Sequence, residues 1–131
     1  TEGSWNRYID AMAHAAEVAR GASVMIGLEN ADLPQIGSLD QARAFIDRIG
    51  NPWFQMYPDI GNVVAHGYEI VPQLQKAIGQ TVAVHIKDAR PGEFRRVGFG
   101  AGIVPFSDAF RALEASGLLR CGTIALKIHT A

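Results

Sequence analysis

The stretch Val82-Ala83-Val84-His85-Ile86-Lys87 decides the fold, because apolar side chains alternate in it with a mixed set. Side chains of a β-strand point to alternate faces, so Val82, Val84 and Ile86 would share one wholly apolar face. The opposite face would carry His85 and Lys87. A strand of a doubly wound sheet, which helices cover on both sides, tends instead to be a continuous apolar run.

The same alternation recurs in three other expected strands, at residues 23–29, 53–59 and 123–129. Helical periodicity separates the strands, over residues 5–20, 38–49, 69–78 and 107–116. Ser38 and Gln41 form a capping-box pattern at the start of the second helix, and Gly50 follows its end. Strands that alternate with helices in this way predict a parallel α/β sheet.

One apolar face for helices and one mixed face suit the wall of a (β/α)8 barrel better than an open sheet. Such a barrel needs ~250 residues, whereas the chain has 131. We therefore expect residues 1–131 to form half of a barrel, with four parallel strands and helices on one face. The lack of an initiator Met is a further indication of a fragment. Open sheet edges predict self-association or pairing with a missing half.

The composition of the chain limits which partners and which cellular compartment are expected. Hydrophobic residues make up 48% of the chain and charged residues 19%, which is typical of a globular domain with a core. The net charge of −1, without a basic stripe, excludes nucleic acid as an expected partner. No apolar run approaches the ~18 residues of a membrane helix, so we expect no membrane partner. Cys121 is the single cysteine, which fits a reducing compartment, and we expect a cytoplasmic protein.

Polar side chains gather at the expected C-terminal ends of the strands, all on the mixed face: Glu29, Asp59, His85, Lys87, Lys127 and His129. The active sites of (β/α)8 barrels lie at this end. Carboxylates and an imidazole that converge there are suitable ligands for Mn²⁺, Zn²⁺ or Mg²⁺. The alternative is that polar residues are simply common where strands leave a sheet. Agreement of phase across the strands favours the site.

Two blocks resemble L-ribulose-5-phosphate (L-xylulose-5-phosphate) 3-epimerases of the xylose isomerase-like TIM-barrel superfamily: Asn51-Pro52-Trp53-Phe54-Gln55-Met56-Tyr57-Pro58-Asp59-Ile60-Gly61-Asn62 and Val82-Ala83-Val84-His85-Ile86-Lys87-Asp88. The loop at residues 100–106 is similar to that of the wider superfamily. The resemblance covers nearly the whole chain. It implies the C-terminal half of the barrel, with the equivalents of strands five to eight. It also implies a divalent metal held by Glu29, Asp59 and His85.

By this resemblance, the protein would be a sugar-phosphate 3-epimerase that removes and returns a proton at C3 of a ketopentose 5-phosphate. Glu29 would be one of its two acid/base groups. Lys87 is expected to contact the substrate. Trp53 and Tyr57 are expected to line the sugar pocket, with filling of the barrel interior as the equal alternative. Arg95 and Arg96 are expected in a solvated loop rather than at the phosphate.

The sequence departs from the family pattern at Lys127, which stands where a fourth ligand, a Glu on the last strand, is expected. A protonated amine cannot ligate a cation and would repel it. A desolvated lysine with a lowered pKa would instead be a base. His129, two residues on, is a less favoured substitute ligand.

Three alternative functions stay open or are excluded on different grounds. Another isomerase of the superfamily, such as a ketohexose 3-epimerase or a hydroxypyruvate isomerase, would act without the phosphate. A non-catalytic barrel half acting by association fits both Lys127 and the short chain. An endonuclease IV-like phosphodiesterase shares the fold but needs more histidine ligands and a basic face.

Overall fold

A computed structural model of the chain describes residues 2–117 and 123–127, so Cys121 and His129 lie outside the described residues. Its helices are α1 (Glu2–Gly21), α2 (Leu39–Ile49), α3 (Ile60–Ala65), α4 (Ile70–Ala77) and α5 (Phe106–Ala115). Its strands are β1 (Ile26–Leu28), β2 (Phe54–Met56), β3 (Ala83–Ile86) and β4 (Thr123–Leu126). In this part of the chain, no helix is both long enough and apolar enough to cross a bilayer.

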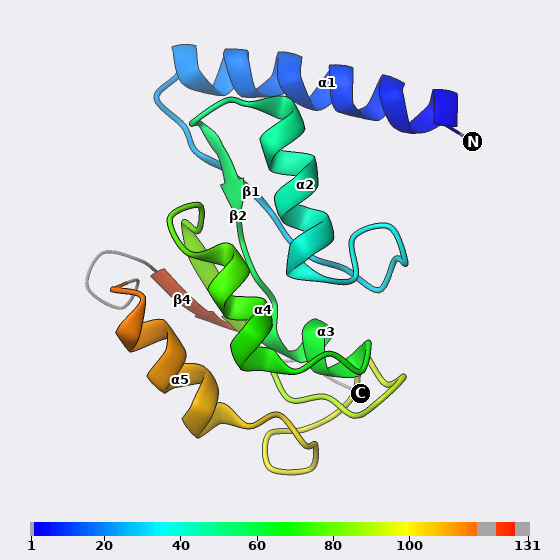
Figure 1. Cartoon of the computed structure of the whole chain (residues 1–131), viewed down its shortest axis with the longest axis vertical. Helices are drawn as coiled ribbons and strands as arrows, with labels where there is room; N and C mark the ends of the chain where they lie inside the picture. The colour runs from blue at the N-terminus through cyan, green and yellow to red at the C-terminus, as the bar shows by residue number, and fades with distance from the viewer. Residues whose placement is uncertain (1, 118–122, 128–131) are drawn as a thin grey trace.

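The described strands run parallel and follow the order of the chain (Figure 1). β1 pairs with β2, and β3 pairs with β4, so that His85 lies opposite Ala125. Two parallel bridges, Met56 to Thr81 and Asp59 to His85, join β2 to β3. The parallel α/β arrangement is the one that the strand and helix patterns predict.

The helices pack on one another in chain order, α1 on α2, α2 on α4 and α4 on α5 (Figure 1). The apolar side chains of the inner strands β2 and β3 are buried with those of the helices, and Phe54, Met56 and Val84 are at most 1% exposed. The core joins both layers through a common set of apolar residues: Leu39, Ala42, Phe45, Ile46, Phe54, Met56, Ile60, Val84 and Ile86. The mixed face of the strands is therefore left for polar groups.

Local signals in the sequence set the bounds of α2. Ser38 Oγ accepts from the backbone N–H of Gln41 at 3.2 Å, and Gln41 Oε1 accepts from the N–H of Ser38 at 3.1 Å. Gly50 has φ 63° and donates its N–H to the Ile46 carbonyl at 2.9 Å. The predicted capping box and glycine cap are thus confirmed.

The first three strands, β1 to β3, are shorter than the sequence predicts. Asp59, predicted within the second strand, lies beyond the end of β2 and donates its backbone N–H to Asn30 Oδ1 at 2.7 Å. Helix α3 has no expected counterpart. Its residues are all buried, so it has no polar face and lacks the periodicity that identifies an amphipathic helix.

The outer strand β4 differs from the inner strands. Ile124 is 40% exposed and Leu126 is 68% exposed, although both lie on the face expected to be apolar and covered. At the opposite edge of the sheet, Val24 and Met25, which precede β1, are also exposed. Within the described residues, helices cover the apolar face of the inner strands but not that of β4.

Candidate metal centre

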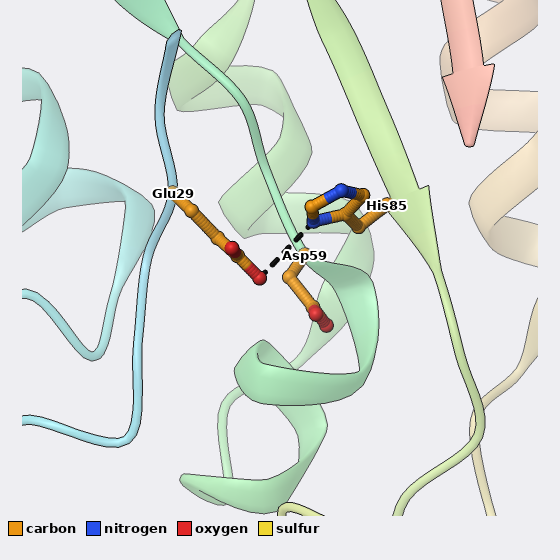
Figure 2. Close-up of side chains that lie close together, drawn as sticks. All are labelled: Glu29, Asp59 and His85. Carbon is orange, nitrogen blue, oxygen red and sulfur yellow. Dashed lines mark ion pairs between the residues drawn. The ribbon is translucent and has the colours of Figure 1, made fainter. Parts of the chain in front are cut away.

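Three potential ligands converge at the C-terminal edge of the parallel strands. Glu29 follows β1 directly, Asp59 follows β2, and His85 lies in β3. One ligand atom from each side chain lies within 4.8 Å of the other two (Figure 2). Because the carboxyl ends of parallel strands meet at the same edge, three distant parts of the sequence supply one site.

Two asparagines hold Asp59 in place. Asn30 is fully buried, accepts from the Asp59 N–H at 2.7 Å and donates to the Asp59 carbonyl at 3.2 Å. Asn62 donates its N–H to Asp59 Oδ1 at 2.8 Å, which makes Asp59 the N-cap of α3, and donates its side-chain amide to the Asn30 carbonyl at 2.7 Å. Asp59 Oδ2 remains directed into the site. Sequence reasoning missed Asn30, although an Asn directly after a candidate ligand at a strand exit was a usable signal.

Two lysines face the two carboxylates. Lys127 Nζ donates to Glu29 Oε1 at 2.5 Å and lies 3.5 Å from Asp59 Oδ2. Lys87 Nζ donates to Asn62 Oδ1 at 2.5 Å and also lies 3.5 Å from Asp59 Oδ2. Two ammonium groups and two carboxylates balance one another when all four are ionised.

Burial and pairing shift the pKa values of this cluster in different directions. Burial raises the pKa of the Asp59 carboxyl, and the charge of Lys87 offsets only part of the effect. Burial also opposes ionisation of Glu29, but hydrogen bonds, first from Lys127, bring its pKa below the ordinary value. The pKa of Lys127 is raised because its hydrogen bond and charge pairing with Glu29 outweigh burial. Burial lowers the pKa of Lys87.

His85 completes the donor set. Its ring lies against Tyr57, with centroids 4.0 Å apart and planes 36° apart. Its Nδ1 atom lies 3.1 Å from Glu29 Oε1, but the two groups are not aligned for a hydrogen bond, so this buried nitrogen lacks an aligned partner among the described residues. An imidazole nitrogen that has no aligned hydrogen bond, together with two carboxylates, is a donor set that fits a divalent cation. Lys127, at the fourth position, does not fit it.

The other candidate residues fall at different places. Tyr57 lies in the site, beside His85. Trp53 precedes β2 and lies six residues before Asp59, ~20 Å along an extended strand, at the opposite end of the sheet. Arg95 pairs with Asp32 at 2.7 Å on the surface. The structure therefore brings Tyr57 to the candidate ligands and keeps Trp53 away from them.

The glycine-rich loop after β3 is anchored to Asp88. Gly100 and Gly102 both donate their backbone N–H to Asp88 Oδ2 at 2.9 Å. These N–H groups are therefore engaged within the chain and do not form an open cradle for a phosphate.

A small open pocket of about 220 Å³ adjoins the cluster. Side chains of both charges line it, including Glu29, Asn62, Lys87, Phe94, Arg95 and Lys127. A polar ligand that enters this pocket would meet the ammonium group of Lys127 and the carboxylate of Glu29.

A family model described as a xylose isomerase-like TIM barrel matches residues 1–128. The chain belongs to this family. The family, together with the parallel strands, identifies the described fold as part of a TIM barrel, as the strand pattern predicts.

Curated relatives carry the resemblance further. The L-ribulose-5-phosphate 3-epimerase UlaE of Escherichia coli O139:H28 (strain E24377A / ETEC) is 39% identical over 122 residues, which is 93% of this chain and 42% of the relative. The E. coli K12 strain DH10B has a relative of the same name, identity and coverage. The expected likeness to L-ribulose-5-phosphate 3-epimerases is thus confirmed. The chain spans less than half the length of these relatives.

Solved structures agree on the fold. An L-ribulose 3-epimerase superposes with a TM-score of 0.86 at 25% identity, over 100% of this chain and 43% of the other. The D-psicose 3-epimerase of Clostridium cellulolyticum H10 superposes with a TM-score of 0.85 over 99% of this chain and 44% of the other. At 18% identity, the second match supports the fold alone.

Proposed function

We propose that the chain carries the cation-binding half of a ketose 3-epimerase active site. Glu29, Asp59 and His85 would be ligands of one divalent cation, Mn²⁺, Zn²⁺ or Mg²⁺. The observation that carries the proposal is the convergence of these three side chains within 4.8 Å at the C-terminal edge of the strands. The 39% identity to proteins named L-ribulose-5-phosphate 3-epimerase supports the reaction type.

The residues of the chain suit removal of a proton next to a sugar carbonyl. A bound cation would polarise the carbonyl and stabilise negative charge on the sugar oxygens. Glu29 would take the proton from C3 as a carboxylate, since its pKa is lowered and it is ionised at neutral pH. Asp59, fixed by Asn30 and Asn62, would hold its ligand oxygen in a constant position.

A ketopentose 5-phosphate is the proposed substrate, on the basis of the named relatives. Lys87, which reaches the wall of the pocket beside Glu29, and Tyr57, which lies against His85, are the proposed substrate contacts. Trp53 is not part of the proposed site because it lies at the other end of β2.

Hydrogen exchange in D₂O tests the reaction even if inversion is lost, because a single acid/base group suffices to exchange the C3 hydrogen. Because Lys127 Nζ lies against Glu29 and Asp59, Lys127→Gln is incubated with Mg²⁺ and L-ribulose 5-phosphate, and the C3 proton signal is followed by NMR. We expect slow loss of this signal, and its retention when Glu29→Gln is added to the variant. The exposed Glu17 gives a matched control, since adding Glu17→Gln instead should leave the exchange unchanged.

The same assay separates the competing isomerases. Faster exchange with free L-ribulose than with its 5-phosphate would favour an epimerase or isomerase of unphosphorylated sugars. Absence of exchange by Lys127→Gln with every sugar, or exchange that persists when Glu29→Gln is added, would contradict the proposed function.

Association is the second part of the proposal. The outer strands carry exposed apolar side chains, Ile124 and Leu126 in β4 and Val24 and Met25 before β1. A second copy, or the other half of a barrel, would cover these groups and continue the sheet. Sedimentation velocity should show dimers or larger species of the chain alone. A single monomeric species in sedimentation, together with a cooperative thermal unfolding transition, would argue against pairing.

A non-catalytic barrel half is the second candidate, and one observation favours it. Lys127 Nζ lies against Glu29 and Asp59, where the proposed cation would bind. C3 hydrogen exchange separates the two candidates, since exchange by Lys127→Gln but not by the parent chain would favour a non-catalytic role for the chain with Lys127 in place.

A further inference from the structure

Lys127 reaches from the end of β4 to the ligand atoms that the other strands present. Its Nζ atom lies 2.5 Å from Glu29 Oε1, the same oxygen that faces His85 Nδ1 at 3.1 Å. It also lies 3.5 Å from Asp59 Oδ2, the oxygen that Asn62 leaves free. The ammonium group and a divalent cation would therefore need the same two oxygen atoms.

We infer that Lys127 is a built-in cation of this site, and that a divalent ion binds only when the Lys127 ammonium group is displaced or removed. The inference rests on the proposed function in one respect, the assignment of Glu29, Asp59 and His85 as cation ligands. It adds that, in the parent chain, the Lys127 ammonium group lies at the ligand oxygens of Glu29 and Asp59 and neutralises part of their charge.

The charge balance supports this inference. When all four groups are ionised, Glu29 and Asp59 contribute two negative charges, and Lys87 and Lys127 contribute two positive charges. A divalent ion that entered beside Lys127 would leave two positive charges uncompensated in a site where Asp59 is fully buried. Repulsion between an ammonium group and a divalent ion is strong when both contact the same oxygen atoms.

The backbone keeps Lys127 at this place. Its N–H donates to the Ile86 carbonyl at 3.0 Å, so the pairing of β4 with β3 continues through residue 127. The side chain then leaves the strand on the face that carries His85, and it is only 30% exposed. The position of the ammonium group follows from the sheet register and does not depend on a free surface side chain.

Lys127 also engages the proposed base. Its ammonium group donates to the Glu29 carboxylate through Oε1, so Glu29 already has a charged partner within the chain. Removal of the ammonium group should therefore free both the cation site and Glu29. A single neutral substitution thus tests the inference.

Mn²⁺ titration by calorimetry compares the parent chain with Lys127→Gln, Lys127→Glu and Lys76→Gln. Lys76 is exposed and pairs with Asp40 outside the cluster, so Lys76→Gln removes the same charge elsewhere. We expect Lys127→Gln to bind Mn²⁺ at least about 30-fold more tightly than the parent, because it removes a cation from the ligand atoms. Lys127→Glu should bind more tightly still, and Lys76→Gln should match the parent. Circular dichroism melts verify folding, and Lys127→Met, which keeps the aliphatic stem, replaces a glutamine variant that does not fold.

Each outcome decides the inference. Equal Mn²⁺ affinity in the parent and in Lys127→Gln would overturn it, while the assignment of the three ligands would stand. Absence of Mn²⁺ binding in every folded variant would overturn both the inference and the proposed cation site. Tight binding of one equivalent by the parent alone, at about 1 μM or below, would overturn the inference without any variant.

Discussion

The carboxylates of two buried aspartates, at the C-terminal ends of β2 and β3, differ in the groups that face them. Asp59 is fully buried and directs Oδ2 toward two lysine ammonium groups at 3.5 Å. Asp88 is 4% exposed, and within the described residues its two oxygens accept from backbone N–H groups alone. The backbone donors belong to four residues of the following loop, Ala89, Gly100, Gly102 and Val104.

The pKa values reflect this difference. Burial raises the pKa of both carboxyls, and in Asp59 this effect prevails over the charge of Lys87. In Asp88 the four backbone N–H groups outweigh burial, so the pKa lies below the ordinary value. A carboxylate held by the backbone is fixed and unavailable to a ligand. A carboxylate faced by side-chain ammonium groups can exchange them for another cation, which is why Asp59 and not Asp88 belongs to the candidate site.

The largest effect on stability is expected at Gly102, in the loop whose backbone N–H groups donate to Asp88. A Cβ atom at Gly102 would overlap the Asp88 carboxylate and lie 2.5 Å from the Ala89 carbonyl oxygen. Gly102→Ala should therefore destabilise the fold by about 3 kcal/mol, since the loop must move and lose its hydrogen bonds. Urea unfolding measures the loss. Gly98→Ala, where a Cβ atom would meet nothing within 4 Å, is the control and should cost less than about 1 kcal/mol.

A smaller loss is expected when Asp88 keeps its shape but loses its charge. Asp88→Asn replaces one acceptor oxygen by an amide that faces backbone donors, so we expect a loss of about 2 kcal/mol in the free energy of unfolding. The exposed Asp108 provides the matched control, and Asp108→Asn should change stability by at most about 0.5 kcal/mol. Equal effects of the two substitutions would contradict the structural role of Asp88.

Low pH should reduce the difference in the free energy of unfolding between the parent chain and Asp88→Asn. The pKa of Asp88 in the fold lies below its ordinary value of 3.8, so the carboxylate stabilises the fold at every pH above that value. This contribution is lost as the pH falls through the folded pKa. Urea unfolding at pH 7, 5 and 3 should show a constant difference between the two chains at the higher pH values and a smaller one at pH 3. A difference in stability that grows between pH 5 and pH 3 would contradict this role of the Asp88 carboxylate.

The smallest effect on stability is expected at Asp59. The double substitution Asp59→Asn/Lys87→Gln removes the buried carboxylate together with the buried ammonium group that faces it at 3.5 Å, so neither charge is left without its partner. An asparagine keeps the cap on α3, and the free energy of unfolding should change by at most about 1 kcal/mol. In a Lys127→Gln background, Asp59→Asn alone should nevertheless weaken Mn²⁺ binding at least about 10-fold, since a ligand is lost. A loss of stability as large as that of Asp88→Asn would remove the contrast between the two aspartates.

Much of the fold could be predicted from the alternation of side chains. The phase that placed Val84 in the core and His85 on the opposite face also placed Glu29 and Asp59 on the side of His85, where the structure brings them together. Period-two patterns record which face is buried, so they identify the candidate ligands before the strand ends are known.

The rest depends on contacts that a linear pattern does not record. Helix α3 is buried on all sides and has no amphipathic signature. Asn30 acts through the backbone of a residue 29 positions away. Lys127 was identified as a departure from the family pattern, but its ion pair with Glu29 depends on how β4 pairs with β3. The sequence indicates which residues are unusual, and the register decides what they touch.

A crystal structure of the Lys127→Glu chain grown with Mn²⁺, with anomalous scattering to locate the ion, tests the shared site most directly. We predict one anomalous peak in contact with Glu29, Asp59 and His85, at about 2.0–2.4 Å from a donor atom of each. Manganese bound elsewhere, or one of the three side chains turned away from the peak, would contradict the account.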